Sequence, residues 1–257
     1  MSETDMSRVD LSGKVAYVNG ASRGIGEAIA RGLARCGSHV ILGSRSIDSV
    51  QAVADDIVAS GGSASAVACH AGRLDEIKAV FESIRDAHGG LDILVNNAAT
   101  NPYFGPAHGL GAEAFDKTVD VNLKGPYYMM AGALPLMIES GGGSIVNVAS
   151  IVALVSMPGQ AVYAMTKAGL VSLTKSFARE YGHKGVRVNA ILPGLVETKF
   201  ASALVDDPKV QKWMARIPAG RAGQPEDMVA GVLYLVSDNA AYTTGTTLVM
   251  DGGATLG

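Results

Sequence analysis

The sequence predicts an α/β fold: a single doubly wound domain of the Rossmann type, with a seven-stranded parallel sheet and helices on both faces. Two observations predict it. Short apolar runs alternate with stretches of helical periodicity along the 257 residues. The runs are apolar at successive positions, not at every second one, which is typical of strands buried on both faces. Right-handed crossovers between such strands give a doubly wound sheet.

The expected elements follow in regular order. Strands are expected at residues 14–19, 39–43, 65–69, 91–96, 144–150, 186–192 and 247–250, and helices at residues 24–36, 48–60, 74–88, 112–138, 162–181 and 225–237. Glycines at 61–62, 89–90 and 141–143 precede strands, where a helix exit needs a positive φ. No linker or repeat interrupts this order, so residues 1–257 are expected to form one domain, with residues 1–10 as a flexible polar tail.

Composition excludes several classes of protein. The chain is 48% hydrophobic and 18% charged, which excludes a disordered chain, and its net charge of −3 with no basic cluster argues against nucleic-acid binding. Its most apolar stretch, residues 145–155, is too short to span a membrane, so no membrane partner is expected. Cys36 and Cys69 lack metal-ligand spacing, and the N-terminus has no signal-peptide pattern. A cytoplasmic location is expected.

A glycine motif follows the first predicted strand. The string Gly20-Ala21-Ser22-Arg23-Gly24-Ile25-Gly26 has the spacing GxxxGxG and opens an amphipathic helix. Gly20 permits a tight turn, while Gly24 and Gly26 allow a pyrophosphate to approach the helix N-terminus. The motif therefore predicts a dinucleotide site that includes Ser22, Arg23 and Ile25.

The end of the second strand indicates which dinucleotide binds. NAD-dependent proteins place an acidic residue there for the ribose 2′-hydroxyl. Here the strand ends at Ser44 and Arg45, and the first acid is Asp48. Arg45 and Arg23 could both reach a 2′-phosphate, although both could also be solvated surface charges. The pattern favours NADP(H) over NAD(H).

Three residues suit hydride transfer to a carbonyl group. Tyr163 and Lys167 are spaced i, i+4 and share one helix face, and Ser150 is expected at the end of the fifth strand. A carbonyl that receives hydride needs a proton donor. Tyrosine, with a reference pKa near 10, becomes an effective one when a nearby cation stabilises its phenolate. Lys167 supplies that cation, and Ser150 can hydrogen-bond the substrate oxygen.

These strings together resemble the short-chain dehydrogenase/reductase family, over residues 11–253, and look most like its NADPH-dependent carbonyl and retinal reductases. The supporting strings are residues 19–26, Asn96-Asn97-Ala98-Ala99, Asn122, Ser150, Tyr163 with Lys167, Pro193-Gly194 with Thr198, and Asp251-Gly252-Gly253. The resemblance implies a catalytic tetrad of Asn122, Ser150, Tyr163 and Lys167, with Asn122 kinking its helix. It also implies cofactor contacts from Asn97, Ala98, Pro193, Gly194 and Thr198, besides Tyr163 and Lys167.

The chain departs from the family pattern at three positions. Asn19 replaces a common threonine, and its side-chain amide is expected to hydrogen-bond to the fourth strand. Ala99 replaces a glycine and adds only a methyl group. His70 stands where an aspartate often reads the adenine amine, which puts that contact in doubt.

Residues 195–224 are expected to form a lid over the substrate. Leu195, Phe200, Leu204, Trp213 and Met214 are apolar there, and Tyr103 and Phe104 follow the fourth strand. These residues could instead pack on the domain. The helix from Asn122 carries one charge, Lys124, so its outer face is expected to contact another subunit. The family resemblance implies a homotetramer, or a homodimer.

The sequence is thus interpreted as an NADP(H)-dependent carbonyl reductase that interconverts a small-molecule apolar ketone or aldehyde and its alcohol. One alternative is a 3-oxoacyl-thioester reductase acting on carrier-bound chains. Another, of a different class, is an inactive dinucleotide-binding sensor or assembly protein. The presence of all four residues Asn122, Ser150, Tyr163 and Lys167 argues against the inactive protein.

Overall fold

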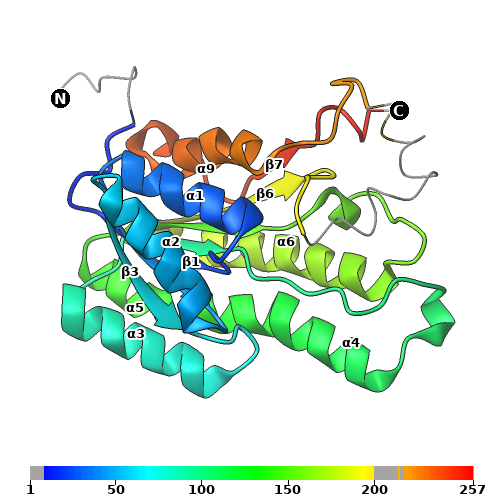
Figure 1. Ribbon diagram of the computed structural model, residues 1–257, viewed down its shortest axis with the longest axis horizontal. Helices are drawn as coiled ribbons and strands as arrows, with labels where there is room; N and C mark the ends of the chain where they lie inside the picture. The colour runs from blue at the N-terminus through cyan, green and yellow to red at the C-terminus, as the bar shows by residue number, and fades with distance from the viewer. Residues whose placement is uncertain (1–8, 200–213, 215–216, 257) are drawn as a thin grey trace.

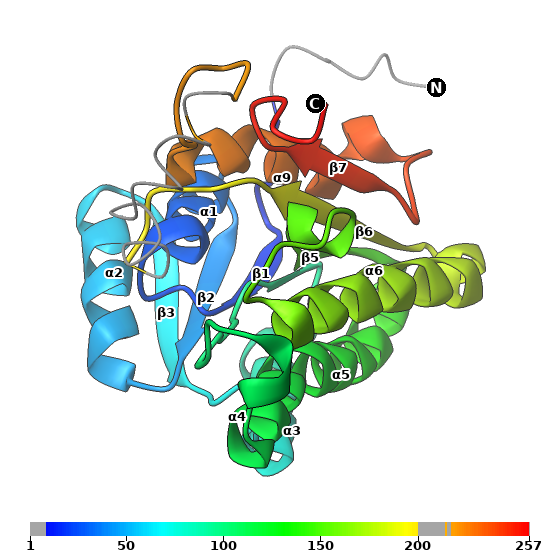
Figure 2. The same cartoon turned by 90° about the vertical axis from the view of Figure 1, so that its right-hand side faces the viewer.

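The computed structural model describes residues 9–199, 214 and 217–256. In this part of the chain seven strands form one parallel sheet in the order β3-β2-β1-β4-β5-β6-β7 (Figures 1 and 2). The strands are β1 (Val15–Asn19), β2 (His39–Ser44), β3 (Ser63–Ala68), β4 (Ile93–Asn96), β5 (Gly143–Val148), β6 (Val186–Pro193) and β7 (Thr247–Met250). The predicted fold class is confirmed.

Helices cover both faces of the sheet (Figure 1). The helices α1 (Gly24–Arg35), α2 (Ile47–Ala59) and α9 (Val229–Val236) share one apolar core with one face, while α3 (Leu74–His88), α5 (Gly125–Glu139) and α6 (Ala161–Tyr181) share a second core with the other. The helix α4 (Ala112–Val119) leads into α5. Short 3-10 turns lie at Ala107–Gly109, Ile151–Ala153, Gly182–Lys184, Pro225–Met228 and Asp238–Ala240.

Three expected elements differ clearly from the prediction. Of the helix expected over 225–237, only Val229–Val236 is α-helical, and Pro225–Met228 forms a 3-10 turn. The fifth strand ends at Val148, not at residue 150, so Ser150 lies in the turn that follows and caps the 3-10 turn at Ile151–Ala153. The helix expected over 112–138 is two helices, α4 and α5, joined by a π-helical turn at Asp120–Lys124 that contains Asn122. Helical periodicity does not reveal a single extra residue in one turn, because the apolar pattern resumes on the far side.

The strand order reverses between β1 and β4. The chain leaves β1 toward β2 and leaves β4 toward β5, so the carboxyl ends of β1 and β4 border the crevice where open α/β sheets bind ligands. Gly20 makes the turn at that point with a φ of +82°, and a Cβ there would lie 2.7 Å from the main-chain nitrogen of Ala98. Only glycine fits this close approach.

A buried polar chain ties the central strands to α6. The amide of Asn96 donates to Oδ1 of Asn147 (2.9 Å), and the amide of Asn147 donates to Oγ1 of Thr174 (2.9 Å). All three residues are almost fully buried. Buried hydrogen bonds of this kind are directional, so they fix the relative placement of β4, β5 and α6.

Parts of the expected tail and lid lie outside the described residues, namely 1–8, 200–213 and 215–216, which include Phe200, Leu204 and Trp213. At the end of the expected tail, Val9 packs partly against the core, and the main-chain nitrogen of Leu11 donates to the carbonyl of Cys36 (2.7 Å). Within the described ranges, none of the helices has both the length and the apolar character needed to cross a bilayer.

Candidate active site

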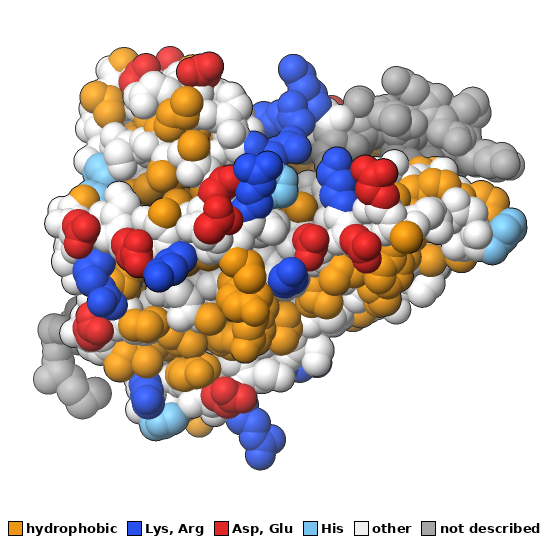
Figure 3. Space-filling view, turned by 90° about the horizontal axis from the view of Figure 1, so that it is seen from below, with side chains coloured by type: hydrophobic (Ala, Val, Ile, Leu, Met, Phe, Trp, Pro, Cys, Tyr) orange, Lys and Arg blue, Asp and Glu red, His pale blue; other side chains and the backbone are white. Residues whose placement is uncertain are grey.

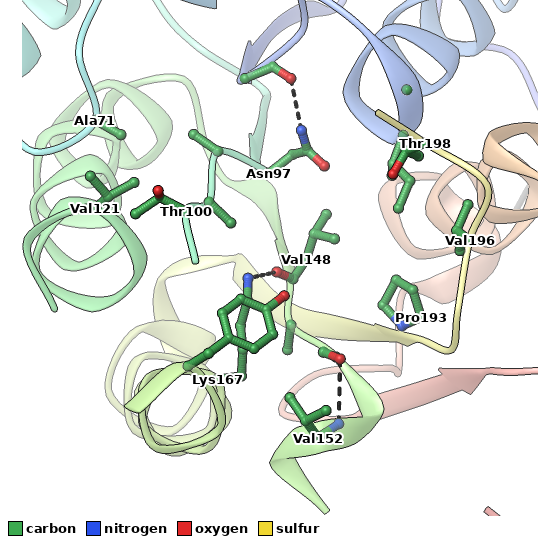
Figure 4. A pocket seen from close by; sticks show the side chains of 18 of the residues that line it. Ala71, Asn97, Thr100, Val121, Val148, Val152, Lys167, Pro193, Val196 and Thr198 are labelled. Carbon is green, nitrogen blue, oxygen red and sulfur yellow. Dashed lines mark hydrogen bonds between the residues drawn. The ribbon is translucent and has the colours of Figure 1, made fainter. Parts of the chain in front are cut away.

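A cavity of about 690 Å³ opens at the carboxyl ends of the strands (Figure 4). It extends from the glycine turn after β1 to the start of α6. Most of the residues predicted for the site line it: Gly20, Ser22, Arg23, Gly24, Ile25, Ser44, Arg45, Asn97, Ala98, Ser150, Tyr163, Lys167, Pro193, Gly194 and Thr198. Gly26 and Asn122 do not, and their environments explain why.

The N-terminus of α1 faces the cavity without a side-chain cap. Arg23 occupies the N-cap position and makes no capping hydrogen bond, so its side chain satisfies none of the free N–H groups of the first helical turn. Gly24 has a φ of +60°. An uncapped helix N-terminus beside a glycine turn is an anion-binding arrangement, because the N–H groups and the helix dipole both favour negative charge.

Gly26 serves the packing of the protein itself. A Cβ at this position would overlap the carbonyl oxygen of Gly20 and lie 2.5 Å from Nδ2 of Asn97. The glycine therefore lets α1 approach the turn after β1 closely, and its predicted contact with a pyrophosphate stays a prediction. Asn97 Nδ2 completes this contact by donating to the carbonyl of Gly20 (2.8 Å; Figure 4).

Asn19 reaches the end of β4 through its main chain. Its carbonyl oxygen accepts from the main-chain nitrogens of Asn97 (3.1 Å) and Ala98 (3.0 Å). The expected bond from the side-chain amide is not among the hydrogen bonds of the described residues, and Oδ1 of Asn19 is buried without a partner among them. The departure from threonine thus leaves an unsatisfied acceptor beneath the cavity.

The charge lining the cavity is of one sign. Among the described lining residues, Arg23, Arg45, Lys117, Lys167 and Lys199 are cationic, and none is Asp or Glu. Arg23 and Arg45 are exposed, and neither forms an ion pair with a described residue. A cavity lined by one sign of charge in a chain of net charge −3 attracts an anion.

Tyr163, Lys167 and Ser150 lie together at the far end of the cavity. Lys167 Nζ lies 5.6 Å from the centroid of the Tyr163 ring and donates to the carbonyl oxygen of Val148 (2.8 Å; Figure 4). Burial lowers the pKa of Lys167 to about 8. Burial also raises the pKa of Tyr163 well above its usual value, and a hydrogen bond with the Ser150 side chain acts in the opposite direction. The cluster therefore holds a neutral phenol beside an ammonium group that can lose its proton near neutral pH.

Asn122 is fully buried behind this cluster. Its Oδ1 accepts from the main-chain nitrogen of Thr100 (2.8 Å), and its Nδ2 donates to the carbonyl of Thr100 (2.8 Å) and to Oγ1 of Thr166 (3.3 Å). Oγ1 of Thr166 donates in turn to the carbonyl of Tyr163 (2.8 Å). The side chain thus connects the loop after β4 to the helix that carries Tyr163 and Lys167.

Several residues that line the cavity were not predicted from the sequence. Lys117 lies one helical turn before Val121, which also lines the cavity. Met157 and Gln160 lie between Ser150 and Tyr163, and Gln160 is three residues before Tyr163. Helical spacing from Tyr163 could have indicated Gln160, because positions i and i+3 share a face. The sequence carries no comparable signal for Lys117 or Met157, since the course of the loops decides where they lie.

Known proteins resemble this chain in sequence and in fold. A family model described as Enoyl-(Acyl carrier protein) reductase matches residues 20–255. Human dehydrogenase/reductase SDR family member 4 is 39% identical over 255 residues, which cover 98% of this chain and 92% of that protein. The L-rhamnose 1-dehydrogenase (NAD(P)(+)) of Azotobacter vinelandii is 41% identical over 249 residues, covering 95% and 97%. A gluconate 5-dehydrogenase from Burkholderia cenocepacia, solved in complex with NADP and tartrate, superposes with a TM-score of 0.95 at 30% identity, covering 99% and 100%.

The fold and the comparisons define an NAD(P)-dependent oxidoreductase. The chain belongs to the short-chain dehydrogenase/reductase family. The family predicted from the sequence motifs is confirmed.

Proposed function

We propose that this protein is an NADP(H)-preferring carbonyl reductase in which Tyr163 acts as general acid and base. The observation that carries the proposal is the cluster of Tyr163, Lys167 and Ser150 at one end of a cavity lined by cations. An inactive binding protein has no need of a buried lysine beside a buried phenol, because burying that charge costs stability.

The lining residues fit a phosphorylated dinucleotide. The uncapped start of α1 suits a pyrophosphate, and Arg45 and Arg23 suit a 2′-phosphate near Ser44. No described carboxylate lines the cavity to repel that phosphate. The NADP bound in the Burkholderia structure supports the same preference. Bound NADPH would supply the hydride. Asn97, Ala98, Pro193, Gly194 and Thr198 would contact the dinucleotide along the cavity.

The four proposed catalytic residues have separate roles in the transfer of a proton to the substrate oxygen. Ser150 holds the carbonyl oxygen of the substrate by a hydrogen bond, and the Tyr163 hydroxyl gives its proton to that oxygen as negative charge develops there. The Lys167 ammonium lowers the energy of the phenolate that remains. Asn122 acts through its bonds to Thr100 and Thr166, which hold the helix α6 in place.

We propose an apolar ketone or aldehyde as the substrate. Phe104, Ile151, Val152, Met157 and Leu195 line the cavity and present apolar surface. Of these, Val152 and Met157 pack with Tyr163. The L-rhamnose and gluconate dehydrogenases among the relatives favour a second candidate, a polyhydroxylated substrate, for which Gln160 and Lys199 would be the polar contacts. The match to the enoyl-(acyl carrier protein) reductase model keeps an acyl-thioester in consideration.

We also propose that the protein is cytoplasmic and forms a homotetramer or homodimer through α4, α5 and α6. Large apolar side chains on these helices remain exposed in the single chain: Phe115, Tyr127, Tyr128 and Met165. Figure 3, which views the side of the molecule that carries α3, α4 and α5, shows hydrophobic side chains gathered in a band across that face. A second copy of the chain would cover such a band.

A spectrophotometric screen tests the proposed function. NADPH and NADH would each be offered with apolar ketones and aldehydes, with sugar-derived ketones and with an acetoacetyl thioester. We expect NADPH oxidation to be fastest with an apolar carbonyl. Faster turnover with the ketosugars or with the thioester would replace the proposed substrate, and no turnover with any of them would favour an inactive protein.

A further inference from the structure

His70 lies in a fixed position at the β3 end of the cavity. Its main-chain nitrogen donates to Oε2 of Glu76 (2.6 Å), and its carbonyl accepts from the main-chain nitrogen of Arg73 (2.9 Å). The ring is held as well, because its Nδ1 accepts a hydrogen bond from the main-chain nitrogen of Gly72 (3.0 Å). His70 is also one of the residues that line the cavity. His70 is therefore a preorganised part of the cavity wall.

The bond from Gly72 determines what the His70 ring offers to a ligand. Because Nδ1 accepts a hydrogen bond, it carries no proton, and the proton of the neutral ring is on Nε2. Nε2 has no hydrogen-bond partner among the described residues. Turning the ring over would lose the bond from Gly72, so the ring presents an N–H donor at Nε2. An aspartate at the same position would present only acceptors.

The place of His70 in the cavity identifies the part of the ligand that it faces. This step rests on the proposed function. With the pyrophosphate at the start of α1 and the reacting half beside Ser150, the other half of the dinucleotide extends toward β2 and β3. The main-chain nitrogen of Cys69 donates to the carbonyl of Ser44 (2.7 Å), which places His70 one strand beyond the residue proposed for the ribose. The purine edge farthest from the ribose carries N1 and the 6-substituent.

We propose that His70 is a specificity-determining residue for the purine of the cofactor, and that its Nε2–H donates to N1 of adenine. The direction of this hydrogen bond is the reverse of that expected for an acidic residue, which would accept from the 6-amino group. The direction of the bond predicts which purine bases the site selects. A purine without the 6-amino group still offers N1 as an acceptor, whereas hypoxanthine carries a proton on N1 and would oppose one donor with another.

Isothermal titration calorimetry with three dinucleotides tests this proposal in the absence of turnover. The ligands are NADP⁺, its analogue with unsubstituted purine and its analogue with hypoxanthine. For the unmodified protein we expect the purine analogue to bind within about threefold of NADP⁺ and the hypoxanthine analogue to bind at least about tenfold more weakly, since an unpaired polar group on binding costs roughly that much. If both analogues lose affinity equally, the ring reads the amine, and the proposal is overturned.

The His70→Phe variant and the His183→Phe control complete the test. His183 is exposed in the turn after α6 and does not line the cavity. We expect His70→Phe to reduce the difference between NADP⁺ and its hypoxanthine analogue to about threefold or less, and His183→Phe to leave it unchanged. A His70→Phe variant that alters only the preference for NADP⁺ over NAD⁺ would place the ring at the phosphate and overturn the proposal. Equal binding of all three ligands to the unmodified protein would overturn the role of His70 alone, whereas no binding of NADP⁺ would overturn the proposed cofactor and this role together.

Discussion

The ammonium group of Lys167 is buried against a main-chain carbonyl, that of Val148, at a distance of 2.8 Å. Lys167 is 2% exposed, and no ion pair between it and a described residue accompanies this bond. A carbonyl dipole compensates a buried charge only in part. The protein therefore carries an electrostatic cost at the place where the proposed reaction needs a cation.

The Lys167→Met variant should be more stable than the unmodified protein at pH 7 and inactive. Burial lowers the pKa of Lys167 from 10.5 to about 8, which corresponds to a cost of about 3 kcal/mol. Leaving the Val148 carbonyl without its donor returns about 1 kcal/mol of that. Urea denaturation of the protein without dinucleotide measures the difference, expected to be about 2 kcal/mol in favour of the variant.

The difference in stability between the unmodified protein and Lys167→Met should depend on pH. Below about pH 8 the lysine is protonated in both the folded and the unfolded protein, so the full cost is present. Between about pH 8 and 10.5 the unfolded chain keeps a proton that the folded protein has released, so the stability of the unmodified protein rises relative to Lys167→Met. An advantage of the variant that stays constant from pH 7 to 10 would contradict the lowered pKa.

The Tyr163→Phe variant should lose turnover and keep its affinity for the dinucleotide. The change removes the proposed proton donor and leaves the aromatic ring in place. Positioned acids and bases contribute about 10²- to 10⁴-fold to rates, so we expect kcat to fall by at least about 10²-fold. Stopped-flow measurement of turnover and fluorescence titration with NADPH separate the two properties. Turnover close to that of the unmodified protein would exclude Tyr163 as the proton donor.

The Arg45→Asp variant should reverse the cofactor preference. Removing a cation and adding an anion beside a 2′-phosphate costs charge-assisted hydrogen bonds, so the NADPH dissociation constant should rise by about tenfold or more. The NADH constant should change by less than about threefold. Arg35→Asp is the matched control, because Arg35 is exposed at the end of α1 and does not line the cavity. Equal weakening of both dinucleotides by Arg45→Asp would remove Arg45 from the phosphate site.

The Thr174→Val variant should destabilise the fold by about 1–3 kcal/mol, because the buried amide of Asn147 loses its acceptor while the side-chain volume stays similar. Ser176→Ala is the control. The Ser176 hydroxyl donates to the carbonyl of Ser172 (3.1 Å), as the Thr174 hydroxyl donates to the carbonyl of Leu170 (2.8 Å). Because Ser176 is exposed, a change within about 0.5 kcal/mol is expected. Urea midpoints measure both. Equal effects of the two changes would mean that the hydrogen bond from Asn147 to Thr174 adds no stability beyond that of the hydroxyl-to-carbonyl bond within the helix.

The Tyr128→Glu variant should lower the oligomeric state. Tyr128 is 39% exposed on α5, and a carboxylate there would be desolvated in an interface between copies. Tyr242→Glu is the control, since Tyr242 is fully exposed outside these helices. Light scattering coupled to size-exclusion chromatography measures the mass. A Tyr128→Glu protein with an unchanged mass would place the subunit contact elsewhere.

The sequence predicts the fold well because most of the strands are apolar on both faces and alternate with helical segments along the chain. It also predicts most of the cavity lining, since Gly20, Ser44, Asn97 and Pro193 lie at or just beyond strand ends that meet at one edge. The sequence does not predict which atoms of a residue form hydrogen bonds. Asn19 contacts the end of β4 through its main-chain carbonyl and not through its side-chain amide, and only the folded structure shows this.

Two further features depend on packing that a single sequence does not encode. Gly26 resembles a ligand contact in the motif, yet the space beside it is filled by Gly20 and Asn97. The tautomer of His70 follows from a bond donated by the main chain of Gly72, which any residue type other than proline could supply at that position.

The π-helical turn at Asp120–Lys124 has a consequence for how this chain tolerates changes in length. A π turn holds one residue more than the helical turn it replaces, so deleting a single residue within it would leave a regular helix. The α4 and α5 segments would then rotate by about 100° relative to each other. Either Asn122 would leave Thr100 and Thr166, or the buried methionines of α5 would turn toward solvent. This segment should therefore keep a constant length among active relatives, while the solvent-exposed turn at residues 107–109 is free to vary.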